Sequence, residues 1–365
     1  MSDKLKVGIA GCGLIARKRH IPAFLKLGRR ASISAVCDTN ESLAQRTAAE
    51  YGIARTYRDF GDMLSRENLD IIDICTPPQI HARLALEGME HSCHILMEKP
   101  MALSVSDCDQ MVNLSHSNGL KLCVVHNMLF FPPLIKARRL VAEGVIGTFT
   151  GMRIFISDPR DNVLLKEDDW AHRLPGGILE ESVSHPVYIS LAFLDRVKQV
   201  YLWSKDFLEH PWTPFDEFRI ELEGERANSS ITKSYTSNSW AAEVDIWGTE
   251  GALHLDLQSM LLIYHKSKRS LNPFALARHS LSEASQIAQG VLANTFQVVA
   301  RRAPLGHDII IEKFVDSVLN GTPSPVTGED GRETVRVVEM IVQQFLKMTT
   351  TKAEKETKPL ADKSG

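Results

Sequence analysis

The chain has 365 residues, of which 44% are hydrophobic and 24% are charged, and its formal net charge at pH 7 is −3. This composition is ordinary for a soluble globular protein, and the length favours two domains with substantial cores. The small net charge argues against a general nucleic-acid binder, and no apolar run approaches the roughly 18 residues that would cross a bilayer.

The chain begins with a short polar segment that leads directly into an apolar strand, and no secretory signal is visible. Its six cysteines are Cys12, Cys37, Cys75, Cys93, Cys108 and Cys123. They form no C-x-x-C pair and no His/Cys metal spacing. We therefore expect a cytoplasmic protein with buried, reduced thiols and no metal site.

Short apolar runs alternate with helical patterns over residues 1–125. The apolar runs are Lys6–Ala10, Ile33–Cys37, Ile71–Cys75, His94–Met97 and Lys121–Val125, and the helical patterns are Ile15 to about Leu27, Leu43–Tyr51, His81–Glu90 and Val105–Ser117. Ser104 with Asp107 resembles a capping box before the last helix. Alternating β and α units imply a parallel sheet covered on both faces, so we expect an α/β domain.

The turn after the first strand, residues 11–16, reads G-C-G-L-I-A and leads into a helix. In this context Gly11 would allow a tight turn, Gly13 would let the backbone approach a pyrophosphate, and Ala16 would keep the helix close to the strand. The helix N-terminus would face the anion. The alternative is an ordinary βα turn without a ligand. We expect dinucleotide contacts from Gly11, Gly13, Leu14, Ile15 and Ala16.

Asp38 ends the second apolar strand, about twenty residues after the glycine turn. An acidic side chain at this place binds the ribose hydroxyls of NAD. The same carboxylate would repel a 2′-phosphate, and the following Thr39 and Asn40 offer no cation. The sequence therefore favours NAD over NADP.

Lys99 directly follows the strand His94–Met97, within a Glu-Lys-Pro triplet. Ligands of open α/β sheets bind at the carboxyl ends of the strands, which would place Lys99 beside the nicotinamide. A lysine near a cofactor can orient a hydroxyl and bias its proton loss. Taken by itself, a lysine at such a place is more often a surface residue in a turn.

A different pattern begins at residue 126. Apolar and polar residues alternate in Gly151–Ile156, Val197–Trp203, Phe218–Leu222, Ser229–Tyr235, Ala242–Trp247 and Ala252–Leu257. Phe218, Ile220 and Leu222 would face one way and the intervening charged residues the other, which is typical of an antiparallel sheet with one wet face. Helices at Pro133–Glu143, Leu179–Leu194 and Asp308–Leu319 should cover its other face. We expect an α+β domain over residues 126–348.

Glu181 and His185 follow a Gly-Gly pair and lie four residues apart, so they share one face of the predicted helix. A carboxylate one turn from an imidazole can orient it, and histidine titrates in the range useful for acid–base catalysis. A surface contact is the alternative.

Two segments depart from the pattern. Residues 266–306 are rich in Lys and Arg and carry an apolar helical stripe from Leu281 to Val299. They predict either a helical hairpin on the sheet or on another subunit, or an amphipathic patch on an anionic membrane. Residues 349–365 are rich in Lys, Thr and Glu and predict a disordered tail.

The ordered set of motifs resembles the glucose–fructose oxidoreductase, inositol dehydrogenase and rhizopine-catabolism family, Gfo/Idh/MocA, over about residues 4–348. Besides the motifs above, the resemblance includes Thr76-Pro77-Pro78 with His81, Trp170, Gly248–Gly251, Asn320–Pro323 and Gly328–Gly331. It implies a Rossmann domain followed by a domain with a large open sheet that often forms oligomer interfaces. It also implies cofactor contacts from Thr76, Pro77, His81, Glu98 and Lys99.

The resemblance implies that Lys99 touches the reacting hydroxyl and that His185 transfers the proton, with Glu181 where relatives carry aspartate. It implies a homo-oligomeric, NAD-dependent oxidoreductase acting on a secondary alcohol of a sugar, an inositol or a nucleotide sugar. The segment 127–132 lacks the arginines of the family pattern, which weakens any transfer of an anionic substrate. The alternative function is a cofactor-binding regulator without turnover.

Overall fold

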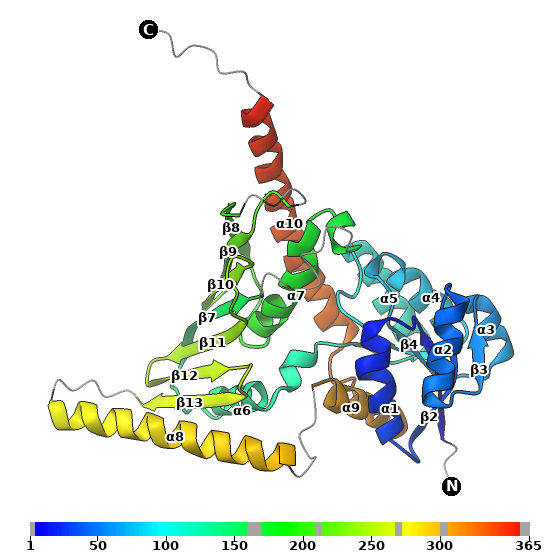
Figure 1. Ribbon diagram of the computed structural model, residues 1–365, viewed down its shortest axis with the longest axis horizontal. Helices are drawn as coiled ribbons and strands as arrows, with labels where there is room; N and C mark the ends of the chain where they lie inside the picture. Colours follow the sequence, from blue (N-terminus) through cyan, green and yellow to red (C-terminus); the bar gives the residue numbers. More distant parts are fainter. Residues whose placement is uncertain are drawn as a thin grey trace. The chain divides into compact units, whose positions relative to one another are not determined.

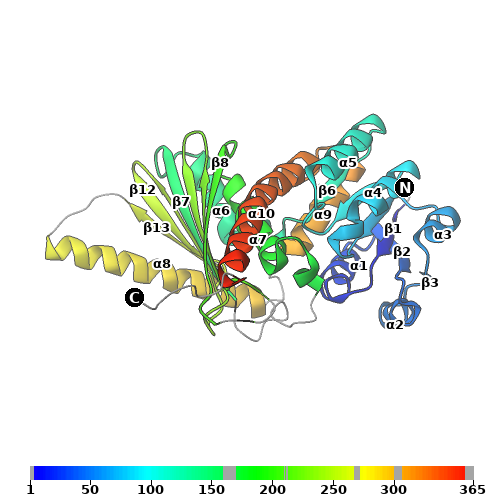
Figure 2. The same cartoon turned by 90° about the horizontal axis from the view of Figure 1, so that it is seen from above.

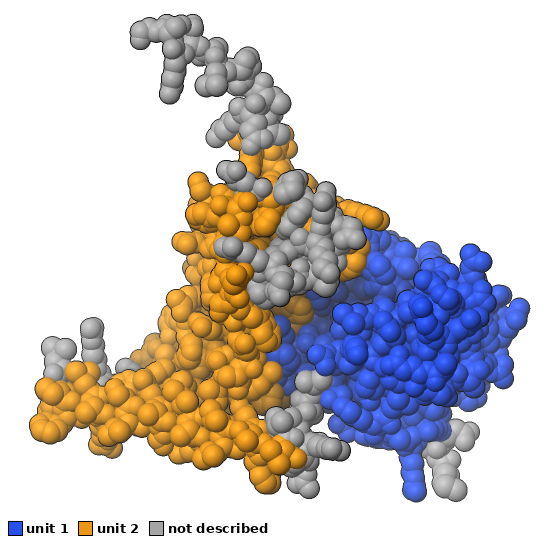
Figure 3. Space-filling model, in the orientation of Figure 1, with its two compact units in different colours: residues 1–131, 304–336 blue, residues 132–303, 337–365 orange. Residues whose placement is uncertain are grey.

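The computed structural model describes residues 4–158, 170–208, 210, 213–266, 272–299 and 306–357. The chain divides into two compact units (Figure 3). Unit 1 combines residues 1–131 with 304–336, and unit 2 combines residues 132–303 with 337–365. The expected division at residue 125 did not foresee that the later segment 304–336 returns to the first unit.

Unit 1 is built on a six-stranded sheet in which every strand pair is parallel. Its strands are β1 Leu5–Ala10, β2 Ala31–Cys37, β3 Arg55–Tyr57, β4 Ile71–Ile74, β5 His94–Met97 and β6 Leu122–Val124. The order β3-β2-β1-β4-β5-β6 is that of a Rossmann fold, as predicted. The chain moves outward from β1 to β3 and then crosses to β4, so the switch point lies where β1 meets β4.

Helices connect these strands (Figure 1). They are the π-helix η1 Ala16–His20, α1 Ile21–Lys26, α2 Glu41–Tyr51, α3 Phe60–Arg66, the 3₁₀ turn η2 Pro78–Ile80, α4 His81–Glu90 and α5 Val105–Ser117, whereas η3 Asn127–Phe130 and α9 Gly306–Asn320 follow the last strand of the sheet along the chain. The predicted capping of α5 is confirmed, because the Ser104 hydroxyl accepts a hydrogen bond from the Asp107 N–H at 3.1 Å.

Helix α9 packs in unit 1 against α1 and η3, so the expectation that it covers the second sheet is wrong. Arg30 binds Glu312 and Asp316 of α9, and Lys26 binds Asp308. The apolar stripe of α9 is buried as the periodicity predicted, but a stripe alone does not say which sheet receives it.

Unit 2 contains a seven-stranded sheet (Figure 2). Its β10–β7 pair is parallel and its other five pairs are antiparallel. Its strands, in the order β13-β12-β11-β7-β10-β9-β8, are β7 Phe149–Ser157, β8 Gln199–Lys205, β9 Glu217–Glu223, β10 Asn228–Ser234, β11 Ala241–Gly248, β12 Gly251–Asp256 and β13 Leu261–Lys266. Phe218, Ile220 and Leu222 are fully buried while the intervening charged side chains are more exposed, which confirms the predicted wet face.

The described helices of unit 2 are α6 Pro132–Ala142, η5 Trp170–Arg173, α7 Gly177–Leu191, α8 Pro273–Val299 and α10 Gly328–Thr357, whose first residues belong to unit 1. Helix α7 contacts β7 and β10. Gln344 of α10 pairs with the backbone of β8, accepting from the Leu202 N–H at 2.8 Å. Helix α10 extends to Thr357, well into the segment predicted to be disordered. Along it, the hydroxyls of Thr349, Thr350 and Thr351 donate to carbonyls of the preceding turn.

Helix α8 is continuous over Pro273–Val299, so the described part of the insertion is one helix rather than a hairpin. It lies along β13 (Figures 1 and 2). Gln286 accepts from the Tyr264 N–H and donates to its carbonyl, which fixes the helix to this edge strand. Among the described helices, none combines the length and apolar character needed to cross a bilayer.

Candidate cofactor and active site

The glycine turn leaves β1 at the switch point of the sheet of unit 1. Gly11 has φ of 95°, and a Cβ atom there would lie 2.6 Å from the carbonyl oxygen of Cys75. Its N–H donates to the Cys37 carbonyl at 2.8 Å. Only glycine meets both demands, because the backbone is left-handed and passes directly against the end of β4.

Gly13 faces open space. A Cβ atom at Gly13 would meet no protein atom within 4 Å, which leaves room for a ligand against the backbone. The first helical bond of this turn joins the Arg17 N–H to the Gly13 carbonyl, so the preceding N–H groups point out of the helix start. Ala16 is fully buried. This cradle suits a pyrophosphate, and the donor set therefore fits a dinucleotide.

Asp38 is held in place by two backbone N–H groups. One carboxylate oxygen accepts from the Cys12 N–H and the other from the Asn40 N–H, both at 2.8 Å. The first bond ties the end of β2 to the glycine turn. The carboxylate is thereby fixed beside the turn, where a ribose would follow a pyrophosphate.

His81 connects the loops that follow β4 and β5. Its Nδ1 lies 2.9 Å from the Pro100 carbonyl and its Nε2 lies 2.8 Å from the Thr76 carbonyl. The ring is fully buried, and burial lowers the pKa of His81. The Lys99–Pro100 peptide bond is cis. The histidine predicted near the cofactor thus links the backbones of Thr76 and Pro100.

The Glu98 carboxylate is directed into unit 1. Its Oε1 lies 2.9 Å from Nε2 of His20 and 3.4 Å from Nε2 of His307, and its Oε2 accepts the Lys99 N–H at 3.1 Å. Burial raises the pKa of Glu98, but the hydrogen bonds from the two histidines outweigh it and hold the pKa well below 4.5. Lys99 itself is half-buried.

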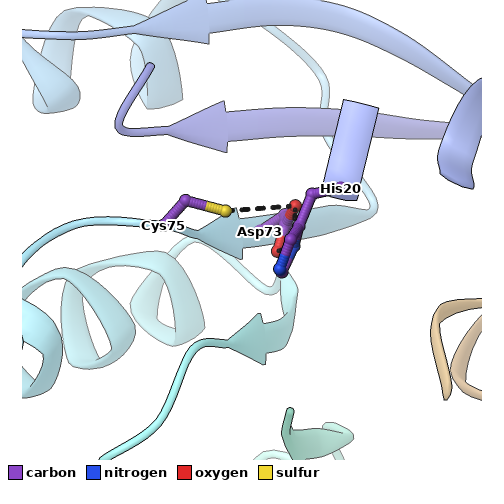
Figure 4. A group of neighbouring side chains, drawn as sticks. All are labelled: His20, Asp73 and Cys75. Atoms are coloured by element: carbon purple, nitrogen blue, oxygen red, sulfur yellow. Dashed lines mark hydrogen bonds and ion pairs between the residues drawn. The ribbon is translucent and has the colours of Figure 1, made fainter. Parts of the chain in front are cut away.

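His20 was not predicted to join this group. Helix η1 is a π-helix, in which the Ile21 N–H bonds to the Ala16 carbonyl, where a regular helix was predicted. It ends on His20, which is fully buried and contacts Asp73 of β4, next to Cys75 (Figure 4). A signal was present, because Asp73 is an acidic residue inside an otherwise apolar strand, and such a group needs a partner.

Three groups of described side chains have the composition of metal ligands: His20 with Asp73 and Cys75, His20 with Glu98 and His307, and His265 with His279 and Glu283. The first two share His20 and are linked by hydrogen bonds. The third joins β13 to α8 through ion pairs of Glu283 with both histidines.

In unit 2, α7 carries the predicted Glu181 and His185. The Gly-Gly turn before it is explained by Gly177, which has φ of 56°, and by Gly176, whose Cβ would lie 2.8 Å from Val342. Both Glu181 and His185 are half-buried on one face. Nδ1 of His185 lies 2.7 Å from the hydroxyl of the buried Tyr188, a partner that the sequence analysis missed although it stands one turn further along the same helix.

Comparisons with known proteins agree with this fold. A family model described as an oxidoreductase family with an NAD-binding Rossmann fold matches residues 5–126. A second model, the GFO/IDH/MocA C-terminal domain, matches residues 134–254. Together the two models cover more than half of the chain.

Individual relatives are distant. D-apiose dehydrogenase of Paraburkholderia graminis is 32% identical over 145 residues, which are 40% of this chain and 38% of that protein. D-glucoside 3-dehydrogenase of Escherichia coli is 30% identical over 146 residues, 40% of this chain and 41% of that protein. The chain thus spans less than half the length of either relative.

The crystal structure of the WlbA dehydrogenase from Bordetella pertussis, in complex with NADH and UDP-GlcNAcA, has the same fold. Its TM-score is 0.75 at 19% identity, over 96% of this chain and 97% of that one. The family resemblance and the expectation of NAD are confirmed. The chain belongs to the Gfo/Idh/MocA family of oxidoreductases, and NAD is the cofactor of its Rossmann domain.

Proposed function

We propose that the protein is a cytoplasmic dehydrogenase that exchanges a hydride between NAD and a secondary alcohol of a sugar, an inositol or a nucleotide sugar. The observation that carries the proposal is the arrangement at the carboxyl ends of three strands of the parallel sheet of unit 1. There the open backbone at Gly13, the fixed carboxylate of Asp38 and the side chain of Lys99 follow β1, β2 and β5 in turn. Open α/β sheets bind ligands at the carboxyl ends of their strands, next to the switch point.

We assign the cofactor to the glycine turn and the loops beside it. Backbone N–H groups of Leu14 and Ile15 would bind the pyrophosphate, and Asp38 would bind the ribose hydroxyls. His81 would act on the cofactor loop through the Thr76 carbonyl, and Pro77 would line that loop. NADP would be disfavoured, because Asp38 repels an additional phosphate.

Bound NAD supplies the hydride acceptor. Lys99 would donate a hydrogen bond to the substrate oxygen and stabilise the negative charge that develops as the proton leaves. His185 would take that proton, with Tyr188 accepting from Nδ1–H so that Nε2 is the basic nitrogen of the ring. Glu181, one turn earlier, would favour the charged imidazole that forms.

The proposed substrate class rests on the polar chemistry of the site and on the relatives. Two relatives at 30–32% identity are named as dehydrogenases of sugars or glycosides. Residues 127–132 carry no arginine, so a neutral sugar or polyol is the first candidate among these substrates.

A screen of NAD reduction with inositols, free sugars and nucleotide sugars tests the proposal. Lys99→Ala and His185→Ala should each lower turnover at least about 100-fold while NAD still binds. Full activity in both variants would remove the assigned roles. If NAD binds but no alcohol or carbonyl compound is turned over, the alternative of a cofactor-binding regulator takes its place.

We also propose that the outer face of α8 contacts a second copy of the chain. Phe274, Leu281, Leu292, Phe296 and Val299 are each more than two-thirds exposed on it. The helix carries only Arg278 and Glu283 as charged residues besides His279, so it lacks the cationic face that an anionic membrane would bind. An apolar helix face with balanced charge favours a protein partner.

A further inference from the structure

His20 is enclosed by two carboxylates in the core of unit 1. Its Nδ1 lies 3.0 and 2.9 Å from the two oxygens of Asp73, and its Nε2 lies 2.9 Å from Oε1 of Glu98. His20 and Asp73 are fully buried, and Glu98 is 9% exposed. The three side chains come from η1, from β4 and from the end of β5, so this cluster joins three separate elements.

The geometry defines the charge of the imidazole. Carboxylate oxygens only accept hydrogen bonds, so both ring nitrogens of His20 must donate, and a ring with two N–H groups is an imidazolium. Burial lowers the pKa of His20, but the interactions with Asp73 outweigh it and hold the pKa well above 6.5. A charge so far from water is retained only because it is paired on both sides.

The protonation states of neighbouring titratable groups are consistent with a charged His20. Cys75, which directly follows β4, donates to Asp73 and is a thiol, because burial raises its pKa. His307 of α9 lies 3.4 Å from Glu98. His126, after β6, is neutral at physiological pH because burial lowers its pKa to about 3.

Glu98 passes the constraint on to the adjacent backbone. While Oε1 is held by His20, Oε2 accepts the N–H of Lys99 at 3.1 Å. The next residue, Pro100, is anchored through its carbonyl to His81. The backbone at Lys99 is therefore fixed by Glu98 on one side and, through Pro100, by His81 on the other. His20 carries the positive charge that holds the Glu98 carboxylate.

We propose that His20 is a positioning residue of the dehydrogenase: its buried imidazolium fixes the Glu98 carboxylate, and Glu98 in turn fixes the backbone from which Lys99 reaches the substrate oxygen. The inference rests on the proposed function of Lys99. The π-helix η1 would then have a role in positioning, because it follows the glycine turn directly and places His20 in the core.

A metal ion is the competing explanation for the same side chains. The separations within the cluster are those of hydrogen bonds, and the two nitrogens of His20 face different carboxylates. A zinc ion would instead require a deprotonated nitrogen and a thiolate, at about 2.0–2.3 Å from the metal. The buried thiol of Cys75 and the doubly donating ring of His20 favour the hydrogen-bonded arrangement.

The test compares the full-length parent with His20→Gln. Glutamine can still donate a hydrogen bond but carries no charge, so no positive charge at this position balances the negative charge of Glu98. We expect kcat to fall about 10- to 100-fold while the dissociation constant for NAD changes less than about two-fold. The kcat profile should gain a new loss of activity on the acid side, because the pKa of Glu98 rises towards the assay range. A purely structural role would not create this ionisation.

His94→Gln is the matched control. His94 is a half-buried histidine of unit 1 whose Nδ1 accepts from the Lys121 N–H at 2.9 Å, at the amino end of β5. It should lose stability without a new ionisation in kcat. The double variant Glu98→Gln with His20→Gln should lower kcat no more than Glu98→Gln alone, because His20 acts through Glu98.

Each outcome decides a separate question. An active parent whose His20→Gln variant keeps its kcat and its pH profile overturns the positioning role. A parent that binds NAD but turns over no substrate overturns the proposed function instead. In that case nuclear magnetic resonance of labelled histidine decides the His20 assignment: both ring nitrogens should stay protonated at pH values well above 6.5. A neutral ring, or stoichiometric zinc lost on substitution of His20, overturns it.

Discussion

The hydroxyl of Tyr188 lies 2.7 Å from Nδ1 of His185, one turn further along α7. The two rings meet edge to face at 5.5 Å, and Tyr188 is buried while His185 is half-buried. A rigid, buried partner on Nδ1 fixes the direction of Nε2 and sets the tautomer of the ring.

Tyr188→Phe should lower kcat about 3- to 30-fold, because the imidazole loses its orienting partner while the aromatic packing is kept. The dissociation constant for NAD, measured by fluorescence titration, should stay unchanged. Phe218→Leu, a conservative change of a buried aromatic residue elsewhere in unit 2, provides the control for packing loss. Equal kcat values for the parent and Tyr188→Phe would show that the bond to Nδ1 has no part in turnover.

Gly11 and Gly13 should respond differently to the same added methyl group. At Gly13 a Cβ meets only open space, so Gly13→Ala should keep the melting temperature and weaken NAD binding at least about 10-fold. At Gly11 the Cβ would lie 2.6 Å from the Cys75 carbonyl, so Gly11→Ala should destabilise the fold itself.

Gly28→Ala is the control for this pair, because Gly28 has φ of 58° and no neighbour within 4 Å of its Cβ. It should cost about 1–2 kcal/mol of stability without loss of NAD binding. Calorimetry with and without NAD separates the three variants. Unchanged NAD affinity in Gly13→Ala would place the cofactor elsewhere.

Asp38→Ala should change the choice of cofactor. Removal of the carboxylate takes away the ribose acceptor and the repulsion of a 2′-phosphate, so the ratio of NAD to NADP affinity should fall at least about 10-fold. Asp59→Ala is the matched control, since Asp59 accepts from the Asp62 N–H at the start of α3 and affects stability alone. An unchanged ratio in Asp38→Ala would contradict the assignment.

Most of the Rossmann sheet could be predicted from the sequence because its central strands are short apolar runs between helical patterns. The strand β3 was missed, since Arg55–Tyr57 is a polar edge strand without such a run. The edge strand β13 was not predicted either; its Leu261, Leu262, Ile263 and Tyr264 are of intermediate exposure and precede the insertion. The edge strands β6 and β8 were predicted, because each carries apolar residues that are buried, whereas β3 carries none.

The candidate site could be predicted only where its residues form a motif of consecutive or nearly consecutive positions. The glycine turn and the Glu-Lys-Pro triplet are such motifs. The cluster around His20 is not, because His20 meets partners 53 and 78 residues away in the sequence. Asp73 within an apolar strand was the one local sign of it. Contacts of this kind depend on strand order, which the sequence pattern does not contain.

The outer face of α8 gives a prediction for oligomeric state. Leu292→Glu together with Phe296→Glu would place two charges on residues that are 71% and 69% exposed. The double variant should shift the protein to a smaller species in analytical ultracentrifugation, because buried charge opposes association. Leu25→Glu, at an exposed leucine of unit 1, should leave the species unchanged. Binding of the parent to anionic vesicles would favour a membrane instead.

The charge pair of His20 and Glu98 predicts how stability depends on pH. The pKa of His20 is raised, so its contribution is complete below about pH 6.5 and is lost as the pH rises through the folded-state value. The pKa of Glu98 is lowered, so its contribution is complete above about pH 4.5 and is lost as the pH falls. The pair therefore stabilises the fold most between these two values.

The difference in free energy of unfolding between the parent and His20→Gln should accordingly shrink as the pH rises above about 6.5. Urea denaturation across the pH range, followed by fluorescence, measures it. His94→Gln should behave oppositely, because burial lowers the pKa of His94 and its protonation destabilises the parent at acid pH. A difference for His20→Gln that grows with rising pH would mean that the ring is buried neutral, and the imidazolium between Asp73 and Glu98 would then be wrong.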